Sequence, residues 1–250
     1  MFLFSPLEQF QILPLIPLHF GELDLSFTNS TFIGLVACTL FLFLFFLILP
    51  TETGGQIIPN RWQVVLESIY EMITSMLNDN IGERGQQYFP FVFVLFTFIL
   101  ICNVIGLVPY SFTLTSHLCV TLTLSMIVFM ACNIICAREH GLHMFALFLP
   151  PGSSLALAPL LVPIELVSYF FRLISLAVRL FANLMAGHTL LKVIAGFGWS
   201  MMIGGLFFSH FAPLFTLYLL FGLELGVAII QAYVFTILTC ISLNDAINLH

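Results

Sequence analysis

The amino-acid sequence predicts an all-α, polytopic membrane protein, and three observations support that fold class. Of its 250 residues, 60% are hydrophobic and only 7% are charged, whereas soluble domains have roughly 25% charged residues. The mean hydropathy of +1.12 points the same way. Several uncharged runs are long enough to cross a hydrocarbon core of about 30 Å. A soluble core cannot hide this much apolar surface, so much of it must face lipid.

The first expected elements are one N-terminal span and one amphipathic surface helix. Residues 31–49 form an uncharged run that ends at Pro50, which predicts the span. In residues 60–78, apolar side chains recur every three or four positions, and Glu67 and Glu71 lie on the opposite side. This helix is too polar to span, so we expect it to lie on the membrane or against another subunit.

A two-span hairpin is expected next. Residues 89–109 and 112–136 are apolar runs joined by the short turn Pro109-Tyr110-Ser111. Each run is long enough to cross the membrane, so the short connection predicts two antiparallel neighbours. Asn103 lies inside the first of these spans, where a polar side chain is costly and usually has a partner or a function.

The remaining apolar sequence predicts a long hairpin of two tilted helices. Residues 155–195 and 206–243 are separated by a glycine-containing break in the range 196–205. A helix over the first arm would be about 60 Å long, roughly twice what a helix normal to the bilayer needs. We expect this arm to be strongly tilted, or broken near Pro159 or Pro163, or both. The second arm poses the same problem.

The few cationic residues predict the topology. None precedes residue 31, whereas Arg61 and Arg84 follow the first span and Arg138 follows the third. Lys and Arg mark the inner side of a membrane. We therefore expect the N-terminus outside and, after five crossings, His250 inside.

Polar side chains form an ordered stripe along the first long arm. On a regular helix, six of them fall within a sector about 80° wide. They are Glu165, Ser168, Arg172, Ser175, Arg179 and Asn183. His188 and Lys192 fall on a different face, and Glu224 and Gln231 share one face of the second arm. A stripe this regular in a membrane helix indicates a functional surface.

Arg179 is the most informative of these residues. No carboxylate lies within one helical turn of it, so its partner must come from another arm or another chain. An arginine keeps its proton and can only hold a fixed charge, whereas His and Glu can relay protons. A fixed cation flanked by titratable groups on other faces suggests two proton routes separated by an electrostatic barrier. The alternative is that these groups merely pair, Arg172 with Glu165 and the rest with neighbours.

Two long segments resemble subunit a of the rotary F-type ATP synthases. Residues 175–188 (SLAVRLFANLMAGH) are similar to the Arg-bearing signature of that family, and residues 222–235 (GLELGVAIIQAYVF) are similar to its second signature. Residues 102–109, which include Asn103, resemble the second-span pattern, and residues 244–250 look like the plant and algal mitochondrial ending. The resemblance extends over nearly the whole chain.

The resemblance implies a proton-translocating stator subunit of the Fo sector, with two aqueous half-channels to the c-ring separated by Arg179. The inlet half-channel and the region of Arg179 would contain His188, Glu224, Asn183 and Gln231. The outlet half-channel would be lined by Glu165 and Ser168. Possible accessory polar residues are Arg172, Ser175 and Asn103. The first long arm would be a steeply tilted helix that follows the ring.

The implied partners are the c-ring, the peripheral stalk and other Fo subunits, within a lipid bilayer. No cofactor, no metal and no catalytic site of its own are expected. His188 after Gly187, together with Glu224, is the pattern of mitochondrial and alphaproteobacterial members, whereas many bacterial and chloroplast relatives have an acid in place of His188. This pattern implies the mitochondrial inner membrane, with the bacterial plasma membrane as the alternative.

Other function classes fit the sequence less well. The net charge of −6 gives no reason to expect nucleic-acid binding. A haem- or quinone-binding redox subunit could use His117, His188 and His210, but the regularly spaced histidine pairs of haem bundles are missing. An ion-coupled secondary transporter would show internal repeats, which we do not find. The sequence also contains no phosphate-binding loop and no H-E-x-x-H motif.

Overall fold

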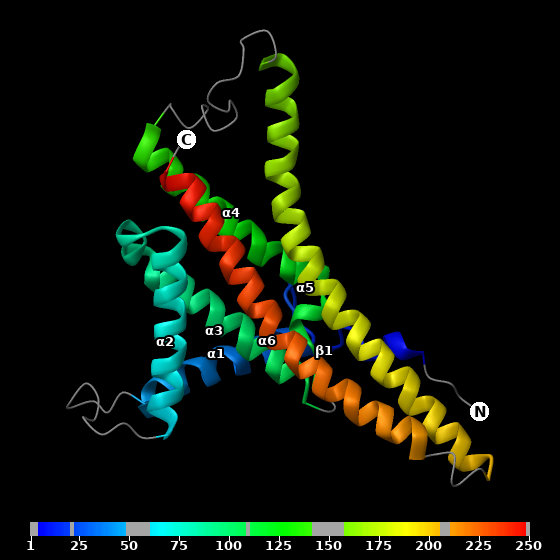
Figure 1. The fold of residues 1–250 in the computed structure, drawn as a ribbon. Coiled ribbons are helices and arrows are strands. Elements are labelled where there is room, and N and C mark those ends of the chain that lie inside the picture. The colour runs from blue at the N-terminus through cyan, green and yellow to red at the C-terminus, as the bar shows by residue number, and fades with distance from the viewer. Residues whose placement is uncertain are drawn as a thin grey trace. The chain divides into compact units, whose positions relative to one another are not determined.

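Helices dominate the computed structural model of the chain (Figure 1). It describes residues 5–20, 23–48, 61–108, 111–141, 158–205 and 211–248. The α-helices are α1 (Asn29–Ile48), α2 (Arg61–Asn80), α3 (Phe89–Gly106), α4 (Leu118–His140), α5 (Ala158–Ile203) and α6 (Phe211–Ile247). The short 3-10 helices are η1 (Pro6–Phe10), η2 (Glu83–Tyr88) and η3 (Leu114–Ser116).

Four helical segments of the described residues are long and apolar enough to cross a membrane. They are Glu83–Gly106, Leu118–His140, Pro159–Ile203 and Phe211–Ile247. Helix α1 is a further apolar helix of 20 residues and contains most of the first expected span. This architecture confirms the predicted fold class, an all-α polytopic membrane protein.

A small β element precedes α1. Strand β1 (Pro14–Ile16) pairs antiparallel with β4 (Phe27–Thr28), and β2 (His19–Phe20) pairs with β3 (Leu23–Asp24). The Asn29 side chain holds the start of α1 to this element, because its Oδ1 accepts from the Leu13 amide at 3.2 Å. Strands of two or three residues produce no readable alternation of apolar and polar side chains, so the sequence did not predict them.

Helix α5 is continuous over 46 residues, which corresponds to about 69 Å. Pro163 lies inside it, so the expected alternative of a break at that proline is wrong. The helix also runs past residue 195 and ends at Ile203, where Gly205 adopts a φ of +77°. Glycine weakens a helix by only about 1 kcal/mol, and in lipid the helix satisfies its own backbone groups, so the earlier glycines do not end it. Helix α6 likewise runs beyond residue 243, to Ile247, whereas residues 206–210 lie outside the described part.

The connection between α3 and α4 is longer than the predicted hairpin turn. Helix α3 ends at Gly106 and α4 begins at Leu118, so residues 112–117 are not part of the third span. A side-chain hydroxyl group stabilises the end of α3, because Ser111 Oγ donates to the Ile105 carbonyl at 2.6 Å. Helix α4 runs past residue 136 and ends at His140. Arg138 in its last turn interacts favourably with the negative end of the helix dipole.

Helix α2 is amphipathic. Ile73, Met76 and Leu77 are buried along one side, whereas Glu67 and Glu71 are exposed. Its length and polarity fit a surface helix better than a span. Asn60, at the predicted start of this helix, lies outside the described residues.

The chain forms two compact units. The first comprises Met1–Leu44, Phe98–His117 and Leu180–Ala232, and the second comprises Phe45–Thr97, Leu118–Arg179 and Tyr233–His250. Helices α5 and α6 contribute to both, and within each unit a part of α5 contacts a part of α6. The polar residues singled out by the sequence are therefore divided between the two units.

Candidate functional site

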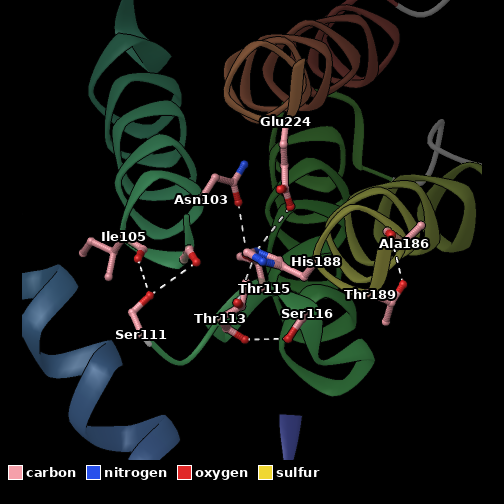
Figure 2. A network of polar contacts seen from close by, with 11 residues as sticks. Asn103, Ile105, Ser111, Thr113, Thr115, Ser116, Ala186, His188, Thr189 and Glu224 are labelled. Carbon is pink, nitrogen blue, oxygen red and sulfur yellow. Dashed lines mark hydrogen bonds and ion pairs between the residues drawn. The ribbon is translucent and has the colours of Figure 1, made fainter. Parts of the chain in front are cut away.

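A buried acid lies beside a histidine in the first unit. Glu224, on α6, is only 5% exposed, and its Oε1 lies 3.5 Å from Nε2 of His188, on α5 (Figure 2). Neither carboxylate oxygen of Glu224 has a hydrogen-bond partner among the described residues. Burying a carboxyl group without hydrogen bonds costs free energy. Here a titratable histidine lies within reach of that carboxyl group, which is the arrangement expected of a proton-transfer pair.

Gly187 creates the space that Glu224 occupies. A Cβ atom at this position would lie 2.7 Å from Glu224 Oε1 and 3.0 Å from its Cδ. Real contacts of this kind are not observed, so any side chain at position 187 would displace the carboxyl group. The residue next to His188 therefore controls where the acid lies.

Gly187→Ala is expected to reduce proton conduction by about tenfold, because overpacking a filled site typically costs 1–3 kcal/mol. The measurement is passive proton conduction through the reconstituted complex. Gly226→Ala is the matched control, since a Cβ at that position of α6 would meet no atom within 4 Å. Alanine favours the helix at both positions. Equal conduction by the two variants would show that the close approach of Gly187 to Glu224 does not affect proton conduction.

A buried loop completes this site. Asn103, on α3, is fully buried and donates from Nδ2 to the Ala228 carbonyl of α6 at 3.2 Å. Thr115 Oγ1 donates to Asn103 Oδ1 at 3.1 Å, and Thr113 Oγ1 lies 3.4 Å from His188 Nε2 (Figure 2). We call Asn103, Thr113, Thr115, His188 and Glu224 the polar cluster. The two threonines were not among the residues singled out from the sequence.

The polar cluster does not include two other predicted residues. Asn183 and Gln231 are half-buried in the same unit. Among the described residues, neither forms a hydrogen bond or ion pair with the cluster. Gln231 lies two turns along α6 from Glu224 and shares its face, as predicted from the seven-residue spacing.

The second unit contains most of the polar stripe. Glu165, Ser168, Ser175 and Arg179 are exposed on α5. Arg172 is also on this stripe, and its Nη1 lies 2.5 Å from Oδ2 of Asp245, on α6. The simple pairing of Arg172 with Glu165 is therefore wrong. Asp245 was not predicted as its partner, because a pair 73 residues apart in sequence leaves no local pattern.

Arg179 has no ion-pair partner within the part of the chain that the structure describes. Its side chain is exposed, whereas its helical neighbours Leu176 and Leu180 are buried. A guanidinium group on a membrane helix cannot face hydrocarbon without a large cost. Arg179 and the exposed polar residues near it therefore require another surface that supplies polar or anionic groups.

These features define a class of protein. A polytopic membrane fold holds a buried acid beside a half-buried histidine, and it also carries an exposed row of polar groups. That row includes Arg179, for which the described residues supply no ion-pair partner. Such an arrangement is typical of a membrane protein that moves protons. The described residues contain no group of three or more His, Cys, Asp or Glu that could hold a metal ion.

The comparisons identify the family. Residues 31–244 match the family model described as ATP synthase A chain. The chain is 56% identical over 248 residues to ATP synthase subunit a of Pylaiella littoralis and 52% identical over 251 residues to that of Marchantia polymorpha, with 98% of this chain and 99% of each relative covered. It is 49% identical over 253 residues to ATP synthase subunit a-2 of Arabidopsis thaliana, covering 72% of that protein.

The chain belongs to the ATP synthase A chain family. It is a proton-translocating membrane subunit of the Fo sector and not a catalytic subunit. The resemblance found in the sequence is confirmed. The redox-subunit and secondary-transporter alternatives are not supported by these comparisons.

Proposed function

We propose that the chain provides two aqueous half-channels to a rotating c-ring and that Arg179 separates them. The observation that carries this proposal is the separation of two kinds of site on α5. Of the titratable pair, Glu224 is buried and His188 is half-buried, whereas Arg179 is exposed and unpaired among the described residues. An arginine cannot pass on its proton, so it blocks direct transfer between two routes that titratable groups serve.

The inlet half-channel uses His188 and Glu224, with Asn183 and Gln231 as further polar groups. A proton that arrives from water protonates the imidazole ring, and Nε2 can give a proton to the adjacent Glu224 carboxylate. The distance of 3.5 Å between Nε2 and Oε1 is slightly long for a hydrogen bond and within reach of a small side-chain movement. Glu224 then supplies the proton to a carboxylate of the ring.

The outlet half-channel uses Glu165 and Ser168, with Arg172 and Ser175 as accessory groups. The second unit contains a small cavity with room for water beside Arg172, lined in part by Tyr169, Thr239 and Ser242. Water held among such groups can accept a proton released by the ring. The exposed Glu165 carboxylate would draw that proton onward.

The ring moves because its carboxyl group changes charge. Once protonated, the neutral group can face lipid at low cost, whereas a carboxylate cannot. When the group loses its proton at the outlet, the new carboxylate is attracted to Arg179, which biases the place where it ionises. A membrane potential contributes about 2.3 kcal/mol per charge per 100 mV to each passage.

The proposed assembly includes the c-ring, the peripheral stalk and other Fo subunits. Exposed side chains on α2, including Trp62 and Tyr70, are suitable for a subunit contact. The combination of Gly187, His188 and Glu224 supports a place in the mitochondrial inner membrane, because family members elsewhere often have an acid in place of this histidine.

A photoactivatable amino acid in place of Ser175 should cross-link to the ring subunit of the intact complex. Ser175 is exposed and lies on the polar stripe. The matched control is the same amino acid in place of Leu166, which is 41% exposed and lies about 140° from the centre of the stripe on a regular helix. Cross-linking to the ring from Leu166 but not from Ser175 would overturn the proposed contact surface.

A further inference from the structure

Residues 112–116, between α3 and α4, are buried although they are not α-helical. Phe112, Thr113, Leu114, Thr115 and Ser116 are all at most 8% exposed. Non-helical backbone among membrane helices is tolerated only where protein buries it or where it lines a water-filled space. Its hydroxyl groups provide part of that compensation, since Ser116 Oγ donates to the Thr113 carbonyl at 2.7 Å.

Thr113 differs from three buried threonines that lie within helices in the partner of its hydroxyl group. Thr97 and Thr121 bond to carbonyls of their own helices, at 2.7 and 3.1 Å. Thr239 does the same, at 2.9 Å. In contrast, Thr113 Oγ1 has His188 Nε2, on α5, as its hydrogen-bond partner among the described residues, at 3.4 Å. This hydroxyl is available to the histidine because no helix carbonyl occupies it.

One nitrogen atom of His188 has two competing neighbours. Nε2 lies 3.4 Å from Thr113 Oγ1 and 3.5 Å from Glu224 Oε1. When Nε2 holds a hydrogen, the charged carboxylate is the stronger acceptor. When Nε2 has lost that hydrogen, its lone pair needs a donor, and a threonine hydroxyl can supply one. Glu224 can donate a hydrogen only while it holds the proton, because a carboxylate only accepts.

The loop is held at the correct place to serve this nitrogen. Asn103 connects Thr115 to the Ala228 carbonyl, which lies one turn along α6 from Glu224. The chain of contacts therefore begins and ends on α6, passing through α3, the loop and α5. Figure 2 shows Thr113, His188 and Glu224 gathered at the centre of this arrangement.

We infer that Thr113 is a positioning residue for His188 in proton transfer, an inference that rests on the inlet role proposed for His188 and Glu224. In the transfer step, the N–H bond at Nε2 of the doubly protonated ring breaks and an O–H bond forms at the Glu224 carboxylate. The ring becomes neutral and keeps its hydrogen on Nδ1. Thr113 then donates its hydroxyl hydrogen in a hydrogen bond to the Nε2 lone pair. This bond stabilises the neutral ring while Glu224 passes its proton on.

The test compares variants of Thr113 in the intact ATP synthase complex reconstituted into liposomes. Thr113→Val keeps the shape and removes the hydroxyl group, and it should slow passive proton conduction by roughly threefold to tenfold, the value of one hydrogen bond. Thr113→Ser should restore conduction to the native rate. Thr121→Val is the matched control, because that buried hydroxyl bonds only to its own helix, and it should conduct normally.

Native conduction by Thr113→Val, or equally slow conduction by Thr113→Ser, would overturn the inference. If the valine variant does not assemble, Thr113→Ser and Thr113→Ala decide the question, because they differ only in the hydroxyl group. Equal conduction by that pair would also overturn it. Failure of the proposed inlet itself is recognised separately, by native conduction in Glu224→Gln.

Discussion

Replacing Glu224 with glutamine is expected to reduce proton conduction through the membrane sector by about 100-fold or more, the usual contribution of a positioned acid or base. The amide has nearly the same shape as the carboxyl group, so packing in the polar cluster is preserved. It cannot take a proton from His188 and release it again. The buried position of Glu224, 5% exposed, leaves little room for water to replace it.

Passive conduction by the reconstituted complex under an imposed membrane potential measures this effect. Glu71→Gln makes the same chemical change on the exposed side of α2 and should conduct at the native rate. Assembly of each variant is checked by native gel electrophoresis. If an assembled Glu224→Gln complex conducts normally, Glu224 is not on the proton route. The contact between His188 and Glu224 would then contribute only to packing.

Arg179→Ala is expected to separate conduction from rotation. Without the fixed cation, the two half-channels are joined, so protons can cross the complex without being carried around by the ring. Passive conduction should therefore persist, even when the ring is held to the stator by a chemical cross-link. Arg179→Lys keeps a positive charge but lacks the planar, permanently charged group, so we expect partial function.

The control for this prediction is Arg138→Ala, which removes an exposed cation from the last turn of α4. In that variant, and in the native complex, cross-linking the ring should stop passive conduction. If cross-linking also stops conduction in Arg179→Ala, the half-channels remain separated without the arginine, and another group forms the barrier.

The sequence predicted the large features of the fold because they depend on composition and spacing. Long uncharged runs predicted the apolar helices, and the three- and four-residue spacing predicted α2. The polar stripe and the pair of Glu224 and Gln231 followed from helix geometry alone. The comparisons confirm the resemblance of the chain to the family.

Helix ends were predicted less well. Helix α5 continues to Ile203 through glycines that would end many soluble helices, because a membrane helix gains from satisfying its own backbone. The sequence predicted that residues 112–117 belong to the third span, because they contain no Asp, Glu, Lys or Arg and adjoin a long apolar run. Their hydroxyl–backbone bonds become visible only in three dimensions.

Long-range pairs were beyond the sequence for another reason. Arg172 pairs with Asp245, and Thr113 contacts His188, across 73 and 75 residues of chain. No local pattern of residue spacing indicates a contact between residues so far apart in the sequence. The signal in the sequence is the group of hydroxyl residues that follows Pro109, because a titratable ring inside a protein usually has a hydrogen-bond partner.

ATP-driven proton pumping tests the role of Arg179 most directly, in membrane vesicles that contain either the native complex or the Arg179→Ala complex. Pumping should be lost in the variant although the complex assembles and hydrolyses ATP. Pumping at the native rate would contradict this role, because Arg179 would then be neither the barrier nor the contact with the ring, and the polar stripe of α5 would be structural.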